Sequence, residues 1–155
     1  MTVRVLMVCL GNICRSPLAQ GVIERAVADA GIAVEADSAG VGGWHRGEPP
    51  DPRAQAAAAA RGLDISGQRA RQTRQADFED FDLILAMDES NLAALERARP
   101  EGARARLALL LDHAPGPERE VPDPYYGGAD GFGRVVDLIE AGVAGLLEDL
   151  ASRRA

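Results

Sequence analysis

The feature that most constrains the fold of this chain is the join between its first strand and its first helix. Residues 3–8 (Val-Arg-Val-Leu-Met-Val) are apolar and rich in β-branched side chains, which predicts a buried strand. Ser16 is typical of a helix N-cap and Pro17 of a first helical residue, and apolar residues follow at helical spacing up to Gly31. The residues between strand and helix must therefore form a tight loop.

Strand and helix signals alternate along the rest of the chain. Three further segments are apolar and of strand length: residues 33–38, 82–87 and 107–111. Helical signals occupy the intervals and the end: residues 52–60, 89–99 and 132–150. This alternation predicts one α/β domain over residues 1–155, with a four-stranded parallel sheet flanked by helices on both faces, a flavodoxin-like or Rossmann-like open sheet.

Composition limits the classes of function. The net charge of -7 argues against a protein that binds nucleic acid or an anionic membrane surface, because both need a basic face. The two cysteines, Cys9 and Cys14, lie together in the loop, so we do not expect a disulfide framework. We expect the protein to be located in a reducing cytoplasm. His45 and His113 have no ligand spacing around them, so we expect no metal and no cofactor.

The loop itself carries the chemistry. In an open parallel sheet, ligands bind beyond the carboxyl ends of the strands, and the first strand ends at Cys9. Backbone N–H groups at a helix N-terminus bind phosphate, and the planar guanidinium of Arg15 matches two phosphate oxygens. The helix N-terminus, Arg15 and the hydroxyl of Ser16 all favour the nucleophilic thiolate of Cys9. The alternative is a buried structural cysteine beside a surface arginine.

A long polar loop, residues 112–130, contains Asp123 before a proline and two tyrosines. Loops of this length are uncommon unless they are functional. By itself the sequence leaves Asp123 as either a general acid or an ordinary turn residue. It likewise leaves Trp44 as either a pocket wall or a loop anchor packed on the body of the protein.

Residues 9–17, Cys-Leu-Gly-Asn-Ile-Cys-Arg-Ser-Pro, resemble the signature loop of the low-molecular-weight protein tyrosine phosphatases. The resemblance continues through several shorter segments and spans nearly the whole chain: residues 37–40, Trp44, residues 50–54, 70–72, 87–91 and 123–127. It implies hydrolysis of phosphotyrosine in proteins, and of aryl phosphates, without a cofactor. The partners it implies are tyrosine-phosphorylated proteins and, as a further candidate, a cognate tyrosine kinase.

The resemblance assigns roles to individual residues. Cys9 attacks phosphorus to form a phosphocysteine, Arg15 clamps the phosphoryl oxygens, and Asp123 protonates the leaving phenolate and then acts as base toward water. The loop and its support comprise Leu10, Gly11, Asn12, Ile13, Cys14, Ser16 and Ser38. In this set Asn12 shapes the loop and the hydroxyls of Ser16 and Ser38 hold it. The walls of the substrate pocket are Trp44, Tyr125 and Tyr126.

Three positions refine this interpretation. Many relatives carry a histidine where this chain has Gln68, which can hydrogen-bond within the supporting network but cannot carry charge. Arginine-phosphatase relatives carry threonine at the position of Ile13, so Ile13 together with Tyr125 favours phosphotyrosine. Cys14 is either a small buried apolar residue or, as in the family, the thiol that captures oxidised Cys9 as a disulfide and makes the enzyme redox-sensitive.

Two alternatives share the same loop. A same-fold arsenate reductase needs further cysteines outside the loop to relay a disulfide, and the sequence has none. A non-catalytic phosphate-binding protein or phosphocysteine carrier does not require both Arg15 and a distal acid. The presence of Cys9, Arg15 and Asp123 together favours an enzyme.

Overall fold

A computed structural model describes the backbone of residues 2–125, 127 and 130–154. Its elements follow one another in this order: β1 (Val3–Cys9), α1 (Arg15–Ala30), β2 (Val34–Gly40), α2 (Pro52–Ala59), α3 (Asp77–Asp80), β3 (Leu83–Ala86), α4 (Glu89–Ala98), β4 (Arg106–Leu109), a 3-10 helix η1 (Leu110–His113) and α5 (Asp130–Arg154). Within this described part of the chain, no helix combines the length and apolarity needed to cross a membrane.

The strands form one parallel sheet in the order β2-β1-β3-β4, as expected from the alternation of strands and helices. The order reverses between β1 and β3, because α1 carries the chain from β1 to one neighbour and the later elements carry it back to the other. Ligands of open parallel sheets bind at such a point, beyond the carboxyl ends of the strands. Cys9 is the last residue of β1 and lies there.

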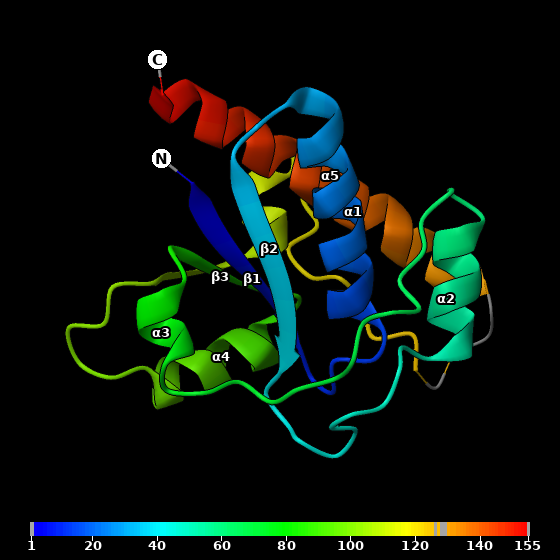
Figure 1. Ribbon diagram of the computed structural model, residues 1–155, viewed down its shortest axis with the longest axis horizontal. Helices are drawn as coiled ribbons and strands as arrows, with labels where there is room; N and C mark the ends of the chain where they lie inside the picture. Colours follow the sequence, from blue (N-terminus) through cyan, green and yellow to red (C-terminus); the bar gives the residue numbers. More distant parts are fainter. Residues whose placement is uncertain (1, 126, 128–129, 155) are drawn as a thin grey trace.

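Helices cover both faces of the sheet (Figure 1). Along β1, Val5 and Met7 point into a large cluster that includes apolar residues of α1, α2 and α5. Leu6 and Val8 point the other way, into a smaller cluster with residues of α3 and α4. All four side chains are fully buried, and burial of each contributes about 1.5–3 kcal/mol relative to exposure. β1 is therefore the shared centre of both clusters.

The predicted start of the first helix is wrong by two residues. α1 begins at Arg15 with Cys14 as its N-cap, so Ser16 lies inside the first turn and Pro17 is the third helical residue. Proline is tolerated there, because the N–H groups of the first helical turn have no acceptor within the helix. The carbonyl of Ile13, just before the cap, accepts the backbone N–H of Asp51 at 2.8 Å, at the start of α2.

The other boundaries agree with local sequence signals or differ for a local reason. Asp51 and Asp88 are N-caps, accepting the backbone N–H groups of Arg53 and Asn91, and Gly31 closes α1 with a φ of 67°. The fourth strand ends at Leu109 rather than at residue 111, because the following residues turn into η1.

Candidate active site

The loop after β1, here called the phosphate loop (residues 9–15), is held by the side chain of Asn12. Asn12 has a φ of 59°, in the left-handed region that asparagine tolerates better than most residues. Its Nδ2 donates to Ser16 Oγ at 2.8 Å and to Ser38 Oγ at 3.0 Å, and its Oδ1 accepts the N–H of Arg71 at 3.0 Å. The side chain that sets the loop's shape is thus fully hydrogen-bonded and buried.

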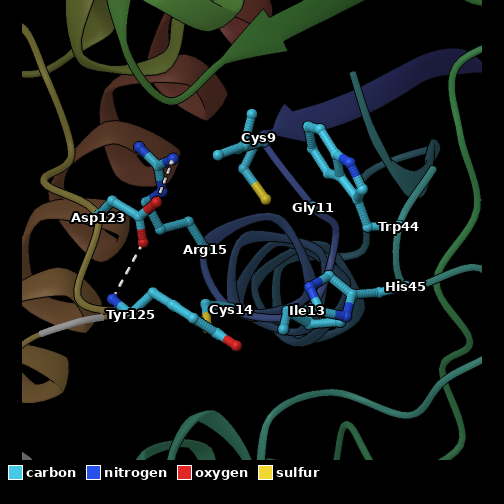
Figure 2. Close-up of a pocket in the computed structure, with 10 residues that line it drawn as sticks. Cys9, Gly11, Ile13, Cys14, Arg15, Trp44, His45, Asp123 and Tyr125 are labelled. Carbon is cyan, nitrogen blue, oxygen red and sulfur yellow. Dashed lines mark hydrogen bonds and ion pairs between the residues drawn. The ribbon is translucent and has the colours of Figure 1, made fainter. Parts of the chain in front are cut away.

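The thiol of Cys9 points into a cavity at this edge of the sheet (Figure 2). Its Sγ lies 3.0 Å from Ser16 Oγ. Since Ser16 Oγ accepts from Asn12, its own hydrogen is free to donate to the sulfur, and the carbonyl of Ala39 at 3.4 Å is the longer alternative acceptor. A hydroxyl donor next to sulfur stabilises a thiolate.

The guanidinium of Arg15 is buried and fully oriented by protein groups. Its Nη1 donates to Asp88 Oδ2 at 2.7 Å and to the carbonyl of Val121 at 2.9 Å, while Nη2 lies 3.5 Å from Asp123 Oδ2. Only 2% of the side chain is exposed, so the charge requires these partners. The sequence analysis gave Asp88 no role in the site. One oxygen caps α4 while the other holds Arg15.

The second layer of the loop contains the position that departs from the family pattern. Ser38 Oγ donates to Gln20 Oε1 at 2.7 Å and lies 3.4 Å from Gln68 Oε1. Gln68 Nε2 donates to the carbonyl of Pro17 at 3.1 Å. Gln68 therefore joins the supporting network as a neutral hydrogen-bonding group. The sequence analysis did not include Gln20, which is recognisable only once α1 is placed beside β2.

The cavity has a volume of about 310 Å³ and brings together most of the predicted site. Its lining residues are Cys9, Leu10, Gly11, Ile13, Cys14, Arg15, Trp44, His45, Asp123 and Tyr125. Asp123 and Tyr125 lie on one side and Trp44 and His45 on the other (Figure 2). The predicted wall residue Tyr126 lies outside the described residues.

The rim of the cavity is apolar and open to solvent. Leu10, Trp44 and Tyr125 are 42%, 70% and 37% exposed, unusual values for large apolar side chains. An exposure of 70% excludes Trp44 as an anchor packed on the body of the protein. His45, which the sequence analysis set aside as an isolated loop histidine, lies over Gly11, where an added Cβ would be 3.0 Å from its ring. Its position next to Trp44 in the sequence was the one signal that could have placed His45 at the cavity.

Asp123 and Cys14 occupy different environments in the same cavity. Asp123 is about one third exposed, and its Oδ1 accepts the backbone N–H of Tyr125 at 3.1 Å. Cys14 is buried, and this burial, reinforced by the negative charge of Asp51, raises the pKa of its thiol to about 12. Cys14 is therefore a neutral thiol at physiological pH. Both cysteines are free.

Metal ligands are not gathered at this site. Over residues 2–125, 127 and 131–152, no group of three or more His, Cys, Asp or Glu side chains is arranged to hold an ion. His113 lies apart, with its Nδ1 2.5 Å from Asp149 on α5.

A thiol, a buried guanidinium and a carboxyl group around one anion-sized loop are the groups expected of the class of proteins that bind a phosphate monoester. Comparison with known proteins specifies the class further. The family model described as "Low molecular weight phosphotyrosine protein phosphatase" matches residues 4–155. The chain belongs to this family, and the predicted family and enzyme class are confirmed.

Individual relatives agree with this assignment. The chain is 48% identical over 153 residues to the low molecular weight protein-tyrosine-phosphatase of Streptomyces coelicolor, covering 95% of this chain and 93% of that protein. The crystal structure of YfkJ from Bacillus subtilis superposes with a TM-score of 0.93 at 37% identity, covering 100% and 98% of the two chains. A Drosophila arginine phosphatase superposes with a TM-score of 0.89 at 32% identity, covering 94% and 96%.

Proposed function

We propose that this protein hydrolyses phosphotyrosine in proteins, and simple aryl phosphates, through a phosphocysteine intermediate. The observation that carries the proposal is the presence of Cys9, Arg15 and Asp123 on the wall of one cavity. In the first step the Cys9 thiolate attacks phosphorus, an S–P bond forms and the P–O bond to the phenol breaks. Asp123 gives its proton to the departing phenolate oxygen. Arg15 and the backbone N–H groups of the phosphate loop stabilise the equatorial oxygens.

The second step regenerates the enzyme. The Asp123 carboxylate takes a proton from water as the water oxygen attacks phosphorus, the S–P bond breaks, and Cys9 leaves as thiolate while inorganic phosphate forms. The donor set of the first step serves again, because charge develops on the same oxygens. The exposure of Asp123 supports this role, since the residue must meet both a leaving group and a water molecule.

The cavity walls support an aryl substrate. Trp44 and Tyr125 stand on opposite sides of the cavity (Figure 2) and can flank a phenyl ring. Leu10 and Ile13, from the phosphate loop, add apolar side chains to the lining. A phosphoserine side chain is too short to reach Cys9 through such a slot. Ile13 is an apolar contact for a ring, which favours phosphotyrosine over phosphoarginine.

We extend the proposal to the setting of the enzyme. Residues 1–155 act as a single phosphatase domain, which the packing of both apolar clusters on one sheet supports. Its partners are tyrosine-phosphorylated proteins, and it requires no cofactor. Both cysteines are free thiols, which supports a reducing cytoplasm as the location.

The test is hydrolysis of p-nitrophenyl phosphate and of peptides carrying phosphotyrosine, phosphoserine or phosphoarginine. We expect the phosphotyrosine peptide to be preferred, Cys9→Ser to be inactive, and Asp123→Ala to lose about 10²–10⁴-fold on phosphotyrosine. Substantial activity in Cys9→Ser would refute the mechanism. Equal rates on phosphotyrosine and phosphoserine, or a preference for phosphoarginine, would refute the proposed substrate.

A further inference from the structure

Arg53, the second residue of α2, makes a set of contacts that the catalytic scheme does not use. Its Nε and Nη2 donate to the two oxygens of Asp51 at 3.1 and 3.0 Å. Its remaining hydrogens reach across to the far side of the site, where Nη2 donates to the carbonyl of Tyr125 at 2.9 Å and Nη1 to the carbonyl of Gly127 at 3.2 Å. The guanidinium thus joins α2 to the backbone just after Asp123.

Asp51 ties this arginine to the phosphate loop. Its backbone N–H donates to the carbonyl of Ile13, in the phosphate loop, at 2.8 Å. Its carboxylate caps α2 and holds the guanidinium, and its side chain is only 11% exposed. One short path therefore runs from Ile13 through Asp51 and Arg53 to Tyr125.

The backbone that carries Asp123 is irregular and is held by contacts on both sides of this residue. Residues 121–125 form no helix or strand. Before Asp123, the segment is held by the Val121 N–H, which donates to Met87 at 2.8 Å, and by the Val121 carbonyl, which accepts from Arg15. After Asp123, the carbonyls of Tyr125 and Gly127 accept from Arg53, and the N–H of Gly127 donates to the carbonyl of Pro124 at 3.0 Å. The Asp123 carboxyl accepts the Tyr125 N–H, so a shift of Tyr125 moves that carboxyl too.

We propose that Arg53 is a positioning residue that places Asp123 for proton transfer by fixing the backbone carbonyls of Tyr125 and Gly127. This role rests on the proposed function. A proton must travel along a hydrogen bond between Asp123 and the leaving oxygen, and misplacement of a catalytic group by about 1 Å can reduce the rate 10²-fold. Arg53 acts only through Asp123 and touches no reacting atom.

The chemistry of the position requires arginine. Only a planar fork can satisfy both oxygens of Asp51 and two carbonyls at once, whereas a lysine ammonium acts as a point donor. Hydrogen bonding to Asp51 raises the pKa of Arg53, and the same hydrogen bonds lower the pKa of Asp51. The pair therefore stays charged throughout the pH range in which the enzyme would work. The guanidinium carbon also lies 5.7 Å from the Tyr125 ring centroid.

The dependence of the rate on the leaving group distinguishes a positioning role from a purely structural one. Loss of a merely structural residue would reduce the rates of all substrates alike. Phenolate is a strong base and needs a proton to depart, whereas p-nitrophenolate is a weaker base and departs without one. A displaced acid must therefore affect phenyl phosphate much more than p-nitrophenyl phosphate. The parameter to compare is kcat/KM, because it includes the steps up to formation of the phosphocysteine.

The experiment compares wild type, Arg53→Met and Arg53→Lys on both substrates. For Arg53→Met we expect kcat/KM to fall about 10–100-fold on phenyl phosphate and less than about 3-fold on p-nitrophenyl phosphate. Arg53→Lys should give a smaller loss with the same substrate pattern, and it keeps the test open if the methionine variant folds poorly. Adding Arg53→Met to Asp123→Asn should cost little further, because the acid that Arg53 positions is already absent.

Arg61→Met is the matched control. Arg61 joins the segment after α2 to α5 through Asp137 at 2.9 Å and through Glu140, and it does not line the cavity. It should leave the ratio of the two kcat/KM values unchanged. Equal loss on both substrates in the Arg53 variants, or no loss, would overturn the positioning role alone. Failure of wild type to hydrolyse either ester would overturn the proposed function and this role with it.

Discussion

Arg15 illustrates how single residues are prepared for chemistry in this protein. Asp88 and the carbonyl of Val121 hold one side of its guanidinium, so its orientation does not depend on a ligand. Donors fixed in advance cost no reorganisation when charge develops on a phosphoryl group. The buried charge in turn depends on Asp88, since an unpaired guanidinium at this depth would be strongly unfavourable.

Cys9 and Cys14 lead to the prediction at the scale of the residue. Mild peroxide should oxidise the Cys9 thiolate to a sulfenic acid, and Cys14 should then attack that sulfur, forming a disulfide and releasing water. Inactivation should be reversed by dithiothreitol in wild type. In Cys14→Ala no neighbouring thiol captures the sulfenic acid, so a second equivalent of peroxide should convert it to a sulfinic acid that dithiothreitol does not reduce. Because the pKa of Cys14 is raised to about 12, its thiolate is scarce, and disulfide formation should accelerate about tenfold per unit of pH.

Mass spectrometry of peroxide-treated protein at pH 7 and pH 8 measures both products. Accumulation of a sulfinic acid at Cys9 with no bond to Cys14 would contradict the prediction. A capture rate independent of pH would contradict the part that depends on the environment of Cys14.

At the scale of the elements, residues 71–73, in the irregular segment before α3, support the phosphate loop. The N–H of Gly40, at the end of β2, donates to the carbonyl of Arg71, and Thr73 N–H donates back to Gly40, both at 2.9 Å. Gly40 is required here because a Cβ would lie 2.9 Å from the backbone of the phosphate loop. Arg71 pairs with Asp37 and with the buried Asp77. These ion pairs hold Arg71 in place, and the backbone N–H of Arg71 donates to Asn12 Oδ1.

Asp77→Asn tests this segment. Burial alone would raise the pKa of Asp77, but hydrogen bonds from Arg71 and Arg74 outweigh it and lower the pKa. A lowered pKa stabilises the fold above the ordinary aspartate pKa, and this stabilisation is lost as pH falls through the lowered value. We expect Asp77→Asn to reduce the free energy of unfolding by about 3 kcal/mol at pH 7, with the difference from wild type shrinking toward pH 3.

Urea denaturation across that pH range is the measurement. Asp29→Asn, which changes an exposed carboxylate on α1, is the control and should alter stability by less than about 0.5 kcal/mol. A loss of stability in Asp77→Asn that stays constant from pH 7 to pH 3 would show that charge is not the cause.

For the molecule as a whole, the single sheet couples its two apolar clusters. Leu85 and Ile84 are neighbours on β3, both fully buried, yet Leu85 belongs to the cluster beneath α1 and α5 and Ile84 to the one beneath α3 and α4. Neither face of the sheet can lose its covering without exposing strands that the other face also needs. Cooperative unfolding follows from this arrangement.

Leu85→Ala and Ile84→Ala should each lower the free energy of unfolding by about 2–5 kcal/mol, since both create cavities in packed clusters. Each variant should still unfold in one transition, with loss of far-ultraviolet circular dichroism coinciding with loss of activity. Leu10→Ala makes the same change at a site that is 42% exposed and should lower stability far less. Two separate transitions in either core variant would contradict a single domain.

The local signals in the sequence were sufficient for much of this protein. Apolar runs located the strands to within two residues, and the predicted helix starts at residues 52 and 89 and the predicted helix end at Gly31 are confirmed. Such features depend on a few neighbouring residues and so can be read along the chain. The cap of α1 was misplaced because Ser16 suits a cap locally but instead contacts the sulfur of Cys9.

Local patterns along the chain were enough to predict the sheet, the phosphate loop and the types of residue in the site. Which distant groups support those residues became clear from the packing of the folded chain. Asp88 holds Arg15, and Arg53 reaches the backbone after Asp123, across separations of 73 and 72 residues. The reason is physical: periodicity and capping are properties of neighbouring residues, whereas these contacts exist only after packing brings distant carbonyls and carboxylates beside a buried charge.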